Sequence, residues 1–389
     1  MTKLTVGKSS ASDTASAVQE ALAEALSGAQ QPVFALVLST DQYDHERLAS
    51  AANSQLDGVP WAGCCTAGVL AGDTLLNQGV VVGVISSTDL KISVGIGGSV
   101  SVHARAAGRS AVAQALAGLP APSASRARAL IVLPDAVTAN AAEVVRGCFD
   151  EAGSGIAWAG GGAGDNLRFI RSAQYAHGRA FHDQVVVVAI EASRVGAGIR
   201  HGWKAYGPPT MVTRARGSSA VELEYEKAFD VYRRTVEHRG GQVSLETFPA
   251  FAMTHPLGIP QADGEHVIRD PLAVEADGSL RCVCEVPDGS LVRIMQGDRE
   301  ALLAAAYAAA SDAREAVRGE LGGALVFDCV SRSLMLGDGV RDELAAFQEG
   351  LGGSRVPIMG CLTFGEIGAL GTGVPQFHNK TAVLLALPA

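Results

Sequence analysis

The sequence lacks a dense cluster of basic residues and a long apolar run. Lys and Arg number 31 against 40 Asp and Glu, which gives a formal net charge of −9. Proteins that follow a phosphate backbone carry a basic patch, so nucleic acid is excluded as the expected partner. No stretch of about 18 apolar residues occurs, so we expect no membrane insertion.

A signal peptide and a disulfide pattern are also missing. Residues 1–15 contain no apolar core of the kind that signal peptides have. The seven cysteines are odd in number, and their spacing does not suggest a disulfide framework. These two features predict a cytoplasmic protein. No CxxCH motif is present, so any haem would be bound non-covalently.

Apolar residues are abundant. They make up 48% of the chain, whereas charged residues make up 18%. This composition supports a large core and excludes extensive disorder. A length of 389 residues predicts two or three domains.

A phrase that recurs along the chain is the most informative positive feature. Residues 59–68 read VPWAGCCTAG, residues 356–365 read VPIMGCLTFG, and a fainter copy, IAWAGGGAGD, covers 156–165. An apolar run and a segment of helical period precede each copy, and a second apolar run follows it. This order predicts a duplicated strand–helix–strand unit whose Gly-rich turns line a common pocket.

Residues 194–320 show a different pattern. A helix is predicted at 220–236 and a second one at 298–320, where Asp298 is a suitable N-cap. Asp-Gly pairs between short alternating runs indicate hairpins. We therefore predict an α/β fold with two domains, covering 1–193 and 194–389. Each has mixed β-sheets flanked by helices and is built from repeated strand–helix–strand units.

Longer strings resemble the FIST family (F-box and intracellular signal transduction proteins). GCCTAG, GGGAGDN and VVVVAI resemble the FIST N domain, whereas VTRARGSSAVELEYEKAFDVY, FDCVSR, GCLTFGEIG and FHNKTAVLLAL resemble the FIST C domain. The resemblance implies a sensory protein for a small ligand, with amino acids proposed and haem bound by some members. It also implies a separate histidine kinase or cyclic-di-GMP enzyme as partner. Val69 stands where an acid is expected, whereas the third copy has Glu366.

Two cysteines occupy equivalent places in the first and third copies. If Cys64 and Cys361 face each other, they could flank one ligand and act as paired acid and base, as in cofactor-independent racemases, epimerases or isomerases. A Gly-rich strand end can lower a thiol pKa through nearby backbone N–H groups. The alternative is that both are small buried residues at a tight turn. The second copy has Gly161 at this place, so the turn does not require a thiol.

Other residues of the repeated strings are candidates for ligand contact. Glu366 could pair with a ligand amine or with Arg332 or Arg269, and the alternative is a structural ion pair. His182, His201, His255 and His378 are alternative haem ligands, and no metal site is predicted. The complete set of predicted ligand-binding residues is Cys65, Thr66, Gly161, Asp165, Asn166, Arg332, Thr363, Glu366, His378 and Asn379.

Two classes of function follow from these residues. The first is a small-ligand sensor that holds an amino acid, a related metabolite or haem between its two domains. The second is an enzyme that uses the paired thiols. The sequence does not decide whether a reaction is catalysed.

Overall fold

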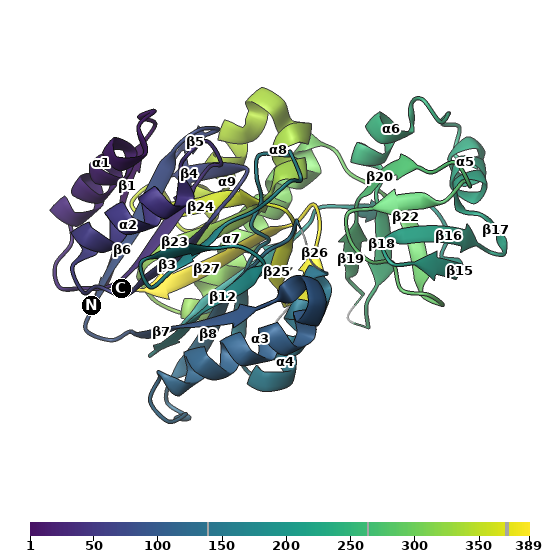
Figure 1. The fold of residues 1–389 in the computed structure, drawn as a ribbon. Coiled ribbons are helices and arrows are strands. Elements are labelled where there is room, and N and C mark those ends of the chain that lie inside the picture. Colours follow the sequence, from purple (N-terminus) through teal and green to yellow (C-terminus); the bar gives the residue numbers. More distant parts are fainter. Residues whose placement is uncertain (138–139, 263, 370–372) are drawn as a thin grey trace.

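A computed structural model describes residues 1–389 except 138–139, 263 and 370–372. Figure 1 shows a large part that contains both termini and a smaller part to one side of it. We call residues 204–296 the lobe and the remaining described residues the body. Among the described residues, the body contains three large sheets with helices on their outer faces and one sheet of two strands, and the lobe contains one sheet of nine strands. The predicted class, mixed sheets flanked by helices, is confirmed.

The body consists of three units with one strand order. The sheets run β1-β6-β2-β3, β7-β12-β8-β9 and β13-β27-β23-β24. In each, the first two pairings are antiparallel and the third is parallel. The first unit contains β1 (Thr2–Ser9), α1 (Thr14–Ser27), β2 (Pro32–Ser39), α2 (His45–Leu56), β3 (Trp61–Cys65) and β6 (Val80–Ser87). The second contains β7 (Lys91–Gly98), α3 (Val100–Ala117), β8 (Ala127–Pro134), α4 (Ala141–Ala152), β9 (Ala157–Gly160) and β12 (Gln184–Ala192).

The third unit is interrupted by the lobe. Its first strand ends at residue 200, and its first helix begins at residue 299. Asp298 is the N-cap of that helix and accepts a hydrogen bond from the backbone N–H of Ala301 at 2.8 Å. The unit contains β13 (Gly196–Arg200), α7 (Arg299–Val317), β23 (Leu321–Cys329), α8 (Val330–Leu336), η1 (Gly337–Gly339), α9 (Val340–Gly350), β24 (Ile358–Thr363) and β27 (Ala382–Pro388).

The central strand of each unit is buried on both faces. In β2, Leu36 and Leu38 point into a core shared by the three sheets, whereas Ala35 and Val37 pack under α1 and α2. The same alternation occurs in β8 and β23, whose outer faces lie under α3 and α4 and under α7 and α9. Strands covered on both faces are expected to be continuous apolar runs rather than alternating ones. This explains why these strands could be recognised from the sequence.

Each unit passes a hairpin to a neighbouring sheet. β4 (Gly68–Ala71) and β5 (Thr74–Leu76) of the first unit extend the third sheet beyond β24, and β10 (Gln174–Ala176) and β11 (Arg179–Phe181) of the second extend the first sheet beyond β3. β25 (Glu366–Gly368) and β26 (Gln376–His378) of the third unit reach the second sheet through a bridge between Gly161 and Glu366.

The three copies of the repeated phrase meet where these hairpins begin. The backbone N–H of Ala67 donates to the carbonyl of Leu362 at 3.1 Å. The N–H of Phe364 donates to the carbonyl of Gly162, and that of Gly164 to the carbonyl of Cys65, both at 3.0 Å. These bonds run from the first unit to the third, from the third to the second and from the second to the first. We call them the axial ring, because they close a cycle of main-chain contacts between the units.

The lobe corrects one sequence prediction. Residues 220–236 were predicted as one helix, but 219–223 form a strand and the helix covers only 228–238. The strand pairs with β15 and β21, so pairing within the sheet overrides the helical propensity of this Ala- and Glu-rich segment. The lobe contains β14 (Lys204–Ala205), β15 (Thr210–Arg216), β16 (Ser219–Leu223), β17 (Glu226–Lys227), α5 (Ala228–His238), α6 (Phe248–Thr254), β18 (Leu257–Pro260), β19 (His266–Arg269), β20 (Pro271–Val274), β21 (Leu280–Cys282) and β22 (Leu291–Gln296).

Among the residues that the structure describes, no helix has the length and apolar character to cross a membrane. All seven cysteines are free thiols in the structure.

Candidate functional site

The two cysteines of the repeated phrase lie in the shared core of the body. Cys64 on β3 and Cys361 on β24 belong to one cluster of buried apolar side chains, and neither is exposed to solvent. Burial raises the pKa of Cys64, and the nearby Cys361 raises it further. Burial also raises the pKa of Cys361, with smaller contributions from Asp328 and Glu366. The expectation of lowered thiol pKa values was therefore wrong: loss of hydration outweighs the nearby backbone N–H groups.

The other predicted residues of the first two copies hold the backbone of the axial ring. Cys65 faces the opposite side of β3 from Cys64, under α1 and α2. The hydroxyl of Thr66 donates to the carbonyl of Gly68 at 2.9 Å. A Cβ on Gly161 would lie 2.5 Å from Cγ2 of Thr363, so this glycine permits close contact between two units.

Asp165 is committed to the loop that follows it. Its two carboxylate oxygens accept hydrogen bonds from the backbone N–H groups of Phe169, Ile170 and Arg171 at 2.6 to 2.9 Å. Asn166 is exposed and has a φ of 56°, which is typical of a turn. Both residues therefore shape the loop at 165–171.

The remaining predicted residues gather at the carboxyl end of β23, where the body meets the lobe. We call this region the junction site. Glu366 has no solvent exposure, and its Oε1 lies 2.9 Å from Oγ1 of Thr363. Its Oε2 accepts a hydrogen bond from the backbone N–H of Thr381 at 3.1 Å. Through the β25–β26 pairing the backbone of Glu366 also lies opposite His378.

Burial favours the protonated form of Glu366. Burial raises its pKa to about 8, although hydrogen bonds from Thr363, Thr381 and the thiol of Cys329 favour the ionised form. Oγ1 of Thr363 is within donating distance of two acceptors, Oε1 of Glu366 at 2.9 Å and the carbonyl oxygen of Asp328 at 3.1 Å. The hydroxyl has one proton, so a proton on Glu366 would remove this competition.

Arg332 is fully buried beside two further acids. Its Nε lies 3.0 Å from Asp328 Oδ1 and 3.0 Å from Glu343 Oε1. Burial raises the pKa of Asp328, and the neighbouring Glu343 carboxylate raises it further. No ion pair between Arg332 and Glu366 is found among the described residues, so the suggested pairing of these two is not present.

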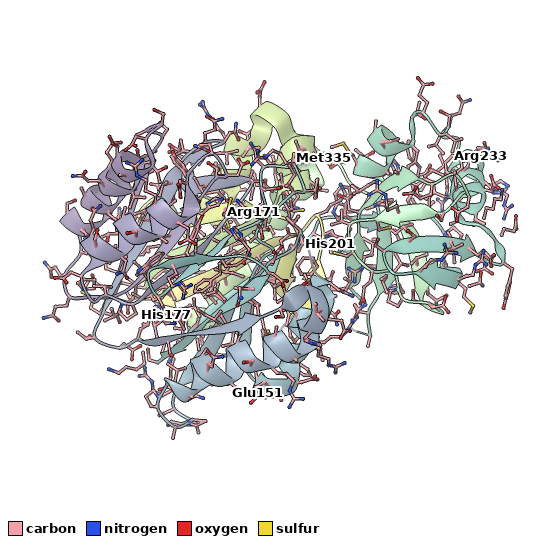
Figure 2. The ribbon with its side chains drawn as sticks, in the orientation of Figure 1. Glu151, Arg171, His177, His201, Arg233 and Met335 are labelled. Carbon is pink, nitrogen blue, oxygen red and sulfur yellow. The ribbon has the colours of Figure 1, made fainter. Side chains whose placement is uncertain are left out.

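Arg332 also forms hydrogen bonds with both segments that connect the body to the lobe. Its Nη1 donates to the carbonyl of His201, directly after β13, and its Nη2 donates to the carbonyl of Leu302 in the first turn of α7, both at 3.0 Å. These are the points where the chain leaves the body for the lobe and returns from it. Figure 2 shows His201 at the boundary between the two parts.

Two further contacts tie the lobe to the junction site. Lys380 is 1% exposed, and its Nζ lies 3.1 Å from Oδ1 of Asp270 in the lobe. Arg269, which was considered as a partner of Glu366, instead donates to the backbone carbonyls of Glu285, Ile268 and Phe377.

Four buried side-chain acceptors of the junction site lack a hydrogen-bond partner among the described residues. They are Nδ1 of His378, Oδ1 of Asn379, Oε2 of Glu343 and Oδ1 of Asp328, and the last of these still forms an ion pair with Arg332. The acceptors on His378 and Asn379 are the two on neutral side chains. Nε2 of His378 lies 3.3 Å from the carbonyl of Gly368 and must donate to it, which leaves Nδ1 as an acceptor. Burial and the charge of Arg269 lower the pKa of His378 to about 3, so the ring is neutral. Nδ2 of Asn379 donates to the carbonyl of His378 at 3.1 Å, which turns Oδ1 away from that bond.

Sequence reasoning found five residues of this site and missed four. Asp328, Glu343, Lys380 and Asp270 were not predicted, and the junction site depends on all four. Asp328 was within reach of sequence reasoning, because it is a charged residue at the end of a buried apolar strand. Lys380 follows FHN directly, but nothing in its sequence indicates that it is buried.

Two of the four histidines considered as haem ligands, His378 and His182, do not fit that role as they lie in this structure. His378 is 6% exposed and keeps one ring nitrogen on a backbone carbonyl. His182 lines a pocket whose other walls are mainly charged or polar, whereas haem is held in largely apolar pockets. No group of three or more His, Cys, Asp or Glu side chains that could hold a metal ion occurs in the described part of the chain.

Comparison with known proteins finds two family domains in the chain. The FIST N domain matches residues 33–226 and the FIST C domain matches residues 228–369. The border between the matches lies inside the lobe, beside β17.

Similarity to solved structures is weak. Over 100% of both chains the protein is similar to a structure described as "Cyanuric acid hydrolase: evolutionary innovation by structural concatenation", with 11% identity and a TM-score of 0.36. It is also similar to a cyanuric acid hydrolase from A. caulinodans, with 14% identity and a TM-score of 0.24, over 48% of this chain and 71% of that one. A search of the curated proteins gives no match.

Proposed function

The chain belongs to the FIST family, whose domains are associated with small-ligand sensing in signal transduction, and from this premise we propose that its ligand is an amino acid or a related metabolite held at the junction site. The observation that carries the proposal is the pair of unpartnered buried acceptors on His378 and Asn379. A buried acceptor without a donor costs about 1 to 3 kcal/mol, so a ligand that brings N–H donors is stabilised there.

The charge of the junction site favours an ammonium group. Asp328, Glu343 and Glu366 surround the guanidinium of Arg332, whereas the guanidinium of Arg269 is bonded to backbone carbonyls. The single positive charge of Lys380 is already paired with Asp270. An approaching ammonium group would lower the pKa of Glu366 and draw its carboxylate into an ion pair.

Signal output follows from where the ligand sits. The junction site is buried, so a ligand enters only if the lobe shifts relative to the body. Arg332 holds both connections to the lobe and shares the acidic cluster, so a new positive charge would compete with it for Asp328 and Glu343. In this proposal a cytoplasmic histidine kinase or cyclic-di-GMP enzyme senses the changed lobe position.

Thermal denaturation with each standard amino acid tests the proposal. A ligand present at about 100 times its Kd stabilises the folded state by about 2.7 kcal/mol, which raises Tm by several degrees. Asn379→Ala should weaken binding at least tenfold, whereas Asn77→Ala, an exposed asparagine outside the site, should leave it unchanged. Stabilisation that is equal in Asn379→Ala and the wild type would show that the ligand binds elsewhere. If no amino acid stabilises the protein, the proposed ligand class is wrong.

The paired-thiol enzyme has less support. Proton removal by Cys64 or Cys361 requires a thiolate, and burial raises the pKa of both thiols. Their neighbours are apolar side chains of the shared core, without the donors that would stabilise the anion.

A further inference from the structure

A pocket of about 490 Å³ lies in the body, where the first and second units meet. One wall is the segment between β2 and α2, residues 41–46. The other is the loop at 165–171 together with His182. Figure 2 places Arg171 of this loop within the body, whereas His201 lies at the boundary with the lobe. The pocket shares no residue with the junction site, and its volume suits a small molecule of one or two rings.

A chain of buried hydroxyl groups ends at one wall of the pocket. Oγ of Ser39 lies 2.8 Å from the hydroxyl of Tyr175, which lies 2.7 Å from Nδ1 of His45. Ser39 and Tyr175 have no solvent exposure. Burial lowers the pKa of His45 to about 4, with contributions from His182 and Arg171, so its ring is neutral at pH 7.

The direction of the hydrogen bonds from Ser39 through Tyr175 to His45 decides whether Nε2 of His45 is a donor or an acceptor. If Tyr175 donates to Nδ1, then Nε2 carries the proton and is a donor. If Nδ1 donates to Tyr175, then Nε2 is an acceptor. Both hydroxyl groups can rotate, so the same pocket wall can either donate or accept a hydrogen bond.

His182 supplies a fixed acceptor. Its Nδ1 lies 2.6 Å from the carbonyl oxygen of Ser172 and must donate to it. In the neutral ring Nε2 is then an acceptor. His182 and His45 line the same pocket.

Most charges of the pocket are already compensated. Asp41 forms an ion pair with Arg168, and Asp165 accepts three backbone N–H groups. Arg171 and Glu46, which carry opposite charges, are exposed at the rim. The lining thus has four carboxylates and two guanidinium groups, and two of the carboxylates, Asp44 and Asp165, are held by backbone N–H groups instead. Because most of these charges already have partners, hydrogen bonds rather than a free charge select the ligand.

We propose that this pocket is a second binding site, for a neutral polyhydroxyl compound such as a sugar or polyol. A hydroxyl group both donates and accepts. It can donate to Nε2 of His182 and accept from, or donate to, Nε2 of His45. The paired carboxylates and guanidinium groups of the wall contact further hydroxyl groups of the ligand. The ring of Tyr43 and the side chain of Ile170 offer apolar surface to the ligand's C–H groups. The site is independent of the ligand proposed at the junction.

Nuclear magnetic resonance of the full chain with ¹⁵N-labelled histidine tests this site. D-glucose, D-ribose, myo-inositol and sorbitol are titrated to about 50 mM, a range that covers weak millimolar binding. At least one should shift the ring nitrogens of His45 and His182 in a saturable way. His182→Gln should weaken that binding at least tenfold, and His103→Gln, an exposed histidine outside the pocket, should not change it.

Two further variants separate the possible causes. Tyr175→Phe should shift the ring nitrogens of His45 without any ligand, because Nδ1 loses its partner. Asn379→Ala should retain polyol binding, which distinguishes this site from the junction site. The proposal is overturned if no polyol gives a saturable shift, if His182→Gln binds as the wild type does, or if malate or spermidine shifts the rings while the polyols do not.

Discussion

Replacement of Glu366 by Gln should change the pH dependence of stability. The pKa of this acid is raised from 4.5 to about 8 in the folded protein, mainly by burial, which corresponds to at most about 5 kcal/mol. Between these two values the folded state retains a proton that the unfolded state has lost. The free energy of unfolding therefore falls as pH rises through this window, by about 1.4 kcal/mol per pH unit from this group. Below the unfolded pKa the group contributes no pH dependence, and above about 8 the loss is complete.

Gln is a close copy of the protonated acid. Its amide N–H₂ can donate to Oγ1 of Thr363, and its carbonyl can accept from the backbone N–H of Thr381, as Glu366 does. The variant should therefore fold, but it cannot ionise. The difference in unfolding free energy between the variant and the wild type should grow by roughly 3 kcal/mol between about pH 5 and pH 7.

Urea unfolding at several pH values measures this difference directly. Glu349→Gln, at an exposed position on α9, is the matched control and should follow the wild type at every pH. If the curves for Glu366→Gln and the wild type are parallel from about pH 5 to pH 8, Glu366 ionises normally and the account of the junction site as a partly protonated acidic cluster is wrong.

Two other predictions concern the axial ring and the thiols. Gly161→Ala should destabilise the protein by about 1 to 3 kcal/mol, since the new methyl group would collide with Thr363. Gly319→Ala, where the added Cβ has no neighbour within 4 Å, should be nearly neutral, and equal Tm values for the two variants would contradict the close packing of the units. In the native protein a thiol reagent should label half-buried Cys284 first and Cys64 and Cys361 very slowly, whereas denaturant should expose all seven thiols. The labelling reaction is followed by absorbance. Rapid labelling of Cys64 in the folded protein would support the hypothesis of an enzyme with paired thiols.

The units of the body could be predicted because both faces of their central strands are buried. This burial produces unbroken apolar runs such as 33–40 and 129–134, which contrast with the amphipathic helices that follow them. In residues 45–56 the spacing of Leu48, Ala52 and Leu56 four apart predicts a helix, and the structure has a helix with these bounds. In the lobe this contrast is absent. Residues 219–223 are rich in good helix formers, and only pairing with β15 and β21 makes them a strand.

The junction site could be predicted only in part, because its members come from segments far apart in the sequence. Glu366, His378 and Asn379 stood out through their repeated or family-like strings. Asp270 reaches Lys380 from the lobe, and no local pattern signals a contact across 110 positions. The thiol pKa values were predicted in the wrong direction because the depth of burial of a strand end depends on the neighbouring units.

The axial ring has a consequence for how such proteins diverge. Its donors and acceptors are peptide groups, so the side chains at these positions are free to vary. The three acceptors belong to a cysteine, a glycine and a leucine, and the three donors to an alanine, a glycine and a phenylalanine. The three units can therefore keep their common fold after the sequence similarity between them has been lost. A search by residue identity would then miss the middle copy although its geometry is retained.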